Sequence, residues 1–203
     1  KAKTFNEQSF SEEGIKRTKR IMNWLEGQGV RFDDASILDI GAASGVFSVP
    51  FAERGAQVTA VETSPPLIEL LQENTAKFGL GQLKVVSERF EDIDVQSRGW
   101  DRAFDLVFVS MCPVIHNWDS VEKIMQCAKH FCYLSMPASS AEHSLVNEVW
   151  PLVSGQPLHP KHTEWGYLLH LLYLKGYAYQ SLITREMKTK EISAAEALQE
   201  ATT

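Results

Sequence analysis

Two carboxylic acids at the ends of successive apolar runs are the residues with the clearest chemical use. Asp39 lies in the run Ile37–Ile40, and Glu62 directly follows the run Gln57–Val61. Because the carboxyl ends of parallel strands meet at one edge of a sheet, we expect the two acids to lie close together. A carboxylate there attracts an ammonium group, and a second one about twenty residues on can accept hydrogen bonds from a ribose.

The segment between the two acids has the composition of a ligand-binding turn. Gly41 and Gly45 permit a tight turn and close approach of the backbone to a ligand, before a helix expected over Val46–Arg54. A dinucleotide-binding loop would place its third glycine at Val46, and Asp39 would repel a pyrophosphate. These departures disfavour a nicotinamide-dependent dehydrogenase and favour a nucleotide-like ligand with a cationic end.

Each acid also has an ordinary structural interpretation. Asp39 could cap amides of the loop, and Glu62 could be a helix-start acid before Thr63 and the following Ser64 and Pro65. Their joint occurrence at this spacing favours the binding interpretation.

The first motif resembles that of the class I S-adenosyl-L-methionine-dependent methyltransferases, in which an acid precedes G-x-G-x-G. This chain reads Asp39, Ile40, Gly41, Ala42, Ala43, Ser44, Gly45, and departs once, at Ala43. The resemblance implies S-adenosyl-L-methionine as cofactor, with the methionine part at Asp39 and the loop and the ribose at Glu62. The cofactor-binding residues it implies are Asp39, Gly41, Ala43, Gly45, Glu62, Thr63, Arg89, Phe90 and Ser110.

The resemblance places contacts to adenine in the stretch 88–93. Phe90, beside Arg89, could stack on the base, and Glu88 or Glu91 could accept a hydrogen bond from its amine. A solvated cluster of surface charges is the alternative for these acids.

The acceptor side is expected after the apolar strand Phe104–Val109. Methyltransferases of adenine or glutamine amides carry Asn-Pro-Pro-Tyr there, whereas this chain has Ser110, Met111, Cys112 and Pro113, which favours a small-molecule acceptor. His116 is the candidate general base, with helix capping as its alternative. Cys112 and His116 could also be a nucleophile pair or half of a metal site, but no further ligands follow, so no metal is expected.

The elements that must position these residues alternate between strands and helices. The pattern predicts an α/β fold: a Rossmann-like, doubly wound, mostly parallel sheet with helices on both faces and an antiparallel C-terminal edge strand. The expected strands are 37–40, 57–61, 83–87, 104–109, 131–136 and 177–187. The expected helices begin at 11, 46, 65, 117 or 119, 139 (ending near Pro151), 163 (ending at Gly176) and 193.

We expect a single methyltransferase-like domain over 1–203. Residues 1–29 form an N-terminal helix or lid, which Phe5, Phe10 or Trp24 would line; 30–137 form the cofactor-binding core; and 138–203 supply substrate-side helices and the edge strand. Pocket candidates in the last part are Trp165, Tyr167, His159, His162 and His170. The last strand of the resembled fold is absent, so we expect either a truncated chain or an edge completed by a second copy in a homodimer.

Composition narrows the classes of partner. The chain has 203 residues, 44% of them hydrophobic, and a net charge of -6, which makes nucleic acid an unfavoured partner. No apolar run approaches the roughly twenty residues needed to cross a bilayer. Three cysteines without paired spacing suit a reducing cytoplasm. The sequence therefore predicts a cytoplasmic small-molecule methyltransferase; the alternatives are an RNA or protein methyltransferase, or a non-catalytic module that binds S-adenosyl-L-methionine.

Overall fold

The structure is a computed structural model that describes residues 1–77, 79, 83–138, 144–156, 165–184, 191 and 193. The chain divides into two compact units, Lys1–Met136 and Pro137–Thr203, which are described separately.

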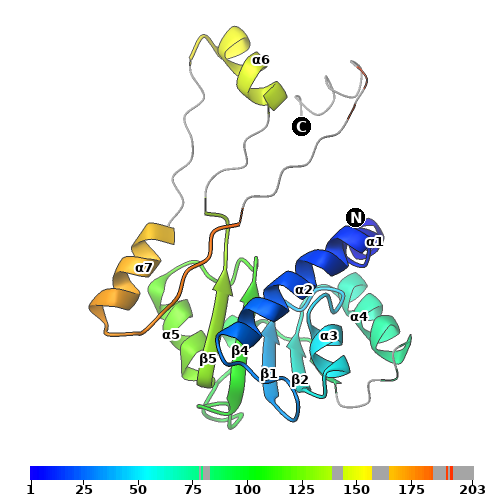
Figure 1. Ribbon diagram of the computed structural model, residues 1–203, viewed down its shortest axis with the longest axis vertical. Helices are drawn as coiled ribbons and strands as arrows, with labels where there is room; N and C mark the ends of the chain where they lie inside the picture. Colours follow the sequence, from blue (N-terminus) through cyan, green and yellow to red (C-terminus); the bar gives the residue numbers. More distant parts are fainter. Residues whose placement is uncertain are drawn as a thin grey trace. The chain divides into compact units, whose positions relative to one another are not determined.

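The first unit is built on five parallel strands in the order β3-β2-β1-β4-β5 (Figure 1). This arrangement confirms the predicted Rossmann-like, doubly wound fold. The strands are β1 (Ser36–Ile40), β2 (Gln57–Val61), β3 (Leu83–Val86), β4 (Phe104–Ser110) and β5 (Ala128–Ser135). The helices are α1 (Ala2–Ser9), α2 (Glu12–Gly27), α3 (Ser48–Glu53), α4 (Pro65–Lys77), the 3-10 turn η1 (Phe90–Asp92) and α5 (Trp118–Gln126).

Residues that alternate along each strand serve two cores, one on each face of the sheet. Ile37 joins a cluster with Met22 of α2 and Phe51 of α3, whereas its neighbour Leu38 joins a cluster with Ile124 of α5. Strand side chains alternate in direction, so Asp39 points to the same face as Ile37, the face that α2 and α3 cover. This placement explains why the acid is buried beneath α3.

Local sequence signals explain the limits of these helices. Ser11 caps α2 by accepting a hydrogen bond from the amide of Gly14 at 3.2 Å. Asn117 caps α5 in a reciprocal box with Ser120, which decides between the two predicted starts of that helix. The helix expected over Val46–Arg54 is a short α3 of six residues that contains Pro50. Helix α1, by contrast, was not predicted.

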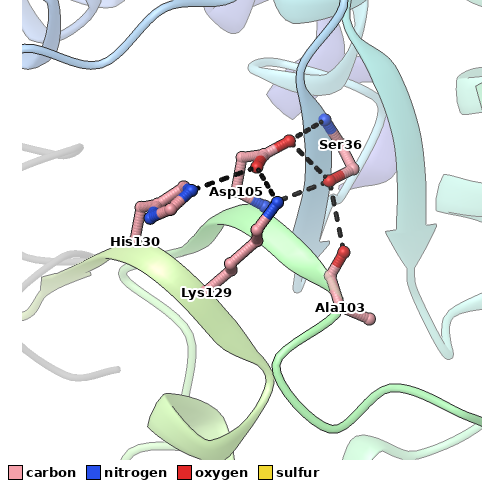
Figure 2. A network of polar contacts seen from close by, with 5 residues as sticks. All are labelled: Ser36, Ala103, Asp105, Lys129 and His130. Atoms are coloured by element: carbon pink, nitrogen blue, oxygen red, sulfur yellow. Dashed lines mark hydrogen bonds and ion pairs between the residues drawn. The ribbon is translucent and has the colours of Figure 1, made fainter.

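The fifth strand begins three residues earlier than predicted, and the reason lies in a polar network (Figure 2). Asp105 of β4 accepts hydrogen bonds from the amide and hydroxyl of Ser36 at 2.9 and 2.8 Å. Its other oxygen lies 3.6 Å from Lys129 Nζ and 3.7 Å from His130 Nε2. Lys129 and His130, which precede the predicted strand, belong to β5, and the network joins the starts of β1, β4 and β5.

The second unit contains two described helices, α6 (Ser144–Ser154) and α7 (Trp165–Leu174). The prediction that the first of them ends near Pro151 was wrong, because α6 continues three residues further with Pro151 inside it. The predicted start at Ser139, the cap Thr163 and the final helix after Ser193 lie outside the described residues.

The expected edge strand Tyr177–Met187 is a further correction. Its described part, 177–184, has no regular secondary structure. A strand needs a hydrogen-bonded neighbour, and no strand pairs with 177–184 in the described part of the chain. Ile183 in this stretch is 69% exposed, so burial does not hold it in an extended conformation either.

Candidate functional site

The two predicted acids lie at the tips of neighbouring strands. Asp39 pairs with Ala60 in the sheet register, and Glu62 directly follows β2. Their charges interact, since Glu62 is among the groups that raise the pKa of Asp39. The amides of Gly41 and Ala42 donate to the carbonyl of Val61 at 2.9 and 3.1 Å, which fixes the loop against β2. The structure therefore brings both acids and the loop to one edge of the sheet.

Asp39 is 2% exposed, and its Oδ2 accepts a hydrogen bond from the hydroxyl of Ser48 at 2.6 Å. Burial raises the pKa of Asp39 to about 7; the bond from Ser48 opposes this shift, and the charge of Glu62 adds to it. Sequence reasoning missed Ser48. A lone hydroxyl inside the apolar run Val46–Phe51 is the signal that could have identified it.

The carboxylate of Glu62 accepts hydrogen bonds from three backbone amides. Its Oε2 accepts from the amide of Ala43 at 2.8 Å, and its Oε1 accepts from Thr63 and Ser64 at 2.8 and 2.9 Å. The side chain thus combines the helix-start interpretation with a bridge to the loop. A carboxylate offers about four acceptor positions, so Oε2 keeps one for a further donor.

The backbone of the loop explains its small residues. Gly41, Ala43 and Gly45 all have positive φ, at 77°, 51° and 88°. A Cβ on Gly41 would lie 2.6 Å from the sulfur of Cys112, and one on Gly45 would lie 2.7 Å from Leu71 Cδ1. Both positions therefore require glycine, because a larger side chain would clash with neighbouring side chains of the protein. At Ala43 the left-handed conformation costs roughly 1 kcal/mol relative to glycine.

One buried polar atom in the loop has no partner among the residues that the structure describes. Ser44 is fully buried, and its Oγ makes no hydrogen bond, although its carbonyl accepts one from Asn74 Nδ2 at 2.8 Å. A buried hydroxyl without a partner is costly, so it is a group that a bound ligand would satisfy.

The side chains expected near adenine contact other side chains of the protein. Phe90 is 3% exposed, and Lys123 Nζ lies 5.3 Å from its ring centroid. Glu88 forms an ion pair with Arg98, and exposed Arg89 lies 3.7 Å from Glu91. The adenine contacts of Phe90 and Arg89 stay predictions.

On the acceptor side, the ring of exposed His116 is held by one hydrogen bond. Its Nδ1 lies 2.9 Å from the carbonyl of Val114. A carbonyl only accepts, so Nδ1 carries the proton and Nε2 of the neutral ring keeps its lone pair. The helix cap is Asn117, so the capping alternative for His116 is wrong.

The neighbouring polar groups narrow the chemistry further. Ser110, at the end of β4, shares a hydrogen bond of 3.2 Å with Ser135. Burial raises the pKa of the Cys112 thiol, and the charges of Glu62 and Glu91 raise it further. A neutral thiol is a poor nucleophile, which argues against a cysteine–histidine pair. Among the described residues no three side chains form a metal-binding group.

The lid residues have separate surroundings. The ring of Trp24 packs edge-on against the ring of Tyr133 in β5, with 6.0 Å between the ring centroids, whereas Phe5 is 43% exposed. Asn6 of α1 accepts a hydrogen bond from Asn74 Nδ2 of α4 at 3.0 Å. In the second unit Tyr167 is exposed. Trp165, Tyr167 and His170, all in α7, stay pocket candidates, and His159 and His162 lie outside the described residues.

A parallel, doubly wound sheet with a glycine loop after β1 and an acid after β2 defines the class of Rossmann-like domains that bind nucleotide cofactors. Residues 37–132 match the family described as "Methyltransferase domain". This match covers just under half of the chain, and it makes residues 37–132 similar to the class of domain that the motif resembles.

Two relatives and one solved structure illustrate the similarity. An uncharacterized protein of Haemophilus influenzae is 30% identical over 75% of this chain and 54% of its own length. Human EEF1A lysine methyltransferase 2 is 33% identical over 47% of this chain and 39% of its own length. The crystal structure of magnesium protoporphyrin IX methyltransferase from Synechocystis with bound SAH aligns with a TM-score of 0.56 and 16% identity, covering 91% of this chain and 94% of that chain. The chain spans about half the length of the first relative and less of the second.

Proposed function

We propose that this chain is an S-adenosyl-L-methionine-dependent methyltransferase with a small-molecule acceptor. The observation that carries the proposal is the pairing of Glu62, which keeps an acceptor position on Oε2, with the unpartnered hydroxyl of Ser44 in the adjoining loop. The family match over residues 37–132 supports methyl transfer but does not specify the acceptor.

The residues present fit this cofactor, which when bound supplies a methyl group on a positively charged sulfur. Glu62 would accept a hydrogen bond from the ribose at the remaining acceptor position of Oε2, and the loop around Ser44 would hold the methionine part. Asp39 lies buried beneath the loop, and the ammonium of the methionine part would stabilise its ionised form against the raised pKa. Methyl transfer in line needs alignment more than covalent help, so the rigid bonds from the loop to β2 and Glu62 serve it directly.

His116 is the proposed general base. Its Nε2 accepts the proton that the acceptor atom loses as it is methylated, while the bond from Nδ1 to Val114 keeps the ring in the required tautomer. We expect His116→Gln to lower kcat by about 10². The acidic limb of the pH–rate profile should disappear, with the Kd for S-adenosylhomocysteine unchanged. An unchanged profile would remove His116 from the mechanism.

The small-molecule acceptor is favoured over RNA by charge. A net charge of -6 works against the phosphate contacts on which RNA affinity depends. The lysine methyltransferase relative matches less than half of this chain, so protein methylation is kept as an outcome of the test.

The deciding experiment supplies S-adenosyl-L-methionine labelled in its methyl group, together with a cell extract divided into small molecules, RNA and protein. Label in the small-molecule fraction, lost in Glu62→Gln, supports the proposal, and mass spectrometry then identifies the product. Label only in RNA or only in protein would show that the acceptor is that macromolecule and not a small molecule. Cofactor binding without any labelled acceptor would instead indicate a binding module.

A further inference from the structure

One amide nitrogen in α4 links the glycine loop to the N-terminal helix. Asn74 Nδ2 donates to the carbonyl of Ser44 at 2.8 Å and to Oδ1 of Asn6 at 3.0 Å. Ser44 O can only accept, so the loop contact fixes which end of the Asn74 amide faces it. Both N–H groups of one side chain are thereby used, one on each element.

We propose that Asn74 is a positioning residue for the methionine end of the cofactor, and that Asn6 of α1 orients its amide. The inference rests on the proposed function, because it assumes that the loop holds that end. Asn74 donates to the carbonyl of Ser44, so it fixes the backbone in the middle of the loop. Ser44 is flanked by Ala43 and Gly45, both with positive φ, and such a backbone needs an external anchor.

The loop amides of Ala43 and Gly45 cannot take over the hydrogen bond that Asn74 donates to Ser44, because both already donate elsewhere. The amide of Gly45 donates to the carbonyl of Ala42 at 2.9 Å, and Ala43 donates to Glu62. The side chain of Asn74 therefore joins α4 to the loop backbone through a hydrogen bond. Asn6 gives α1 a defined role there, which the sequence had assigned to aromatic residues.

The test compares two ligands that differ at the methionine end. S-adenosylhomocysteine carries the amino acid, whereas 5′-methylthioadenosine lacks it. We expect Asn74→Asp, which replaces the two donors with a carboxylate facing two oxygens, to weaken S-adenosylhomocysteine about tenfold in calorimetry. The affinity for 5′-methylthioadenosine should stay within about twofold of the wild-type value, since this ligand lacks the amino acid that the loop contacts.

The matched control is Gln72→Glu, the same amide-to-acid change at an exposed position of the same helix, which should alter neither affinity. Asn6→Ala leaves α4 intact and should weaken S-adenosylhomocysteine about threefold, but should add nothing in an Asn74→Ala background. This variant keeps the test available if Asn74→Asp does not fold.

Three results would overturn the inference. Asn74→Asp and Asn6→Ala could bind both ligands as the wild type does, Asn74→Asp could weaken both ligands equally, or the effects of Asn6→Ala and Asn74→Ala could simply add. A wild-type chain that binds neither ligand would contradict the proposed function itself, and the inference would fail with it.

Discussion

Asp39 shows how burial changes the chemistry of a single residue. A carboxyl group that is 2% exposed loses hydration on folding, and one hydrogen bond from Ser48 offsets this loss only in part. The pKa of Asp39 is therefore about 7 in the folded state, against an ordinary value of 3.8. The ionised form is therefore disfavoured in the native protein.

This shift predicts a specific dependence of stability on pH. Between about pH 4 and 7 the native state binds a proton at Asp39 that the unfolded state has released, so the contribution of this group to stability falls as pH rises. Asp39→Asn stays neutral and should raise the free energy of unfolding at pH 8 by about 2 to 4 kcal/mol.

Urea unfolding at pH 4 and pH 8 measures this difference, which should nearly vanish at the lower pH. Ser48→Ala is the companion variant, because it removes the side-chain hydrogen bond that favours the ionised acid and should destabilise the protein more at pH 8 than at pH 4. Equal stability of wild type and Asp39→Asn at both pH values would contradict the assigned pKa.

At the scale of elements, the contact of the loop with α4 depends on the absence of a side chain. Gly45 has a φ of 88°, and an added Cβ would lie 2.7 Å from Leu71 Cδ1 and 3.1 Å from Val49 Cγ2. Gly45→Ala should therefore lower the free energy of unfolding by about 2 kcal/mol, through backbone strain and overpacking together.

Gly27→Ala is the matched control, because Gly27 lies in α2 with no atom within 4 Å of an added Cβ. Helix propensity predicts that this change is neutral or stabilises the protein by up to about 1 kcal/mol. Thermal unfolding of the two variants checks the contrast. Similar effects of both changes would show that the loop tolerates a side chain.

A second prediction at this scale concerns the polar network at the starts of three strands (Figure 2). Hydrogen bonds from the amide of Ser36 are the main cause that lowers the pKa of Asp105, so its stabilising effect is present above pH 3.8 and is lost as pH falls through the lowered value. Asp105→Asn should cost about 1 kcal/mol at pH 7, measured by urea unfolding.

Lys129→Gln provides the comparison in the same network. The ion pair from Lys129 to Asp105 is 3.6 Å long and its lysine side chain is 53% exposed, so its loss should cost less than about 0.5 kcal/mol. A larger effect for Lys129→Gln than for Asp105→Asn would reverse the proposed order of the two interactions.

At the scale of the whole molecule, charge determines which partners can approach. A net charge of -6 repels a polyanion, so we expect no binding of tRNA tighter than about 10⁻⁴ M even in 50 mM salt. Fluorescence anisotropy with labelled tRNA measures this affinity. Micromolar binding that weakens steeply with salt would revive the RNA alternative. In the described part of the chain no helix is both long and apolar enough to span a bilayer.

The sequence by itself determined the order of the five strands and of helices α2 to α5 in the first unit, because alternating apolar runs, caps such as Ser11 and Asn117, and the acid–glycine motif are local signals. It also predicted that Asp39 and Glu62 meet at one sheet edge, since parallel strand tips must converge. It failed for Tyr177–Met187, where a strand-like pattern has no pairing partner in the described residues.

Only the tertiary structure decided what the side chains touch. Ser48 lies on Asp39, Asn74 links Ser44 to Asn6, and a cation covers Phe90. These contacts join residues from separate elements, 68 positions apart for Asn6 and Asn74. No local pattern encodes such a distance, because it depends on how the helices pack on the sheet.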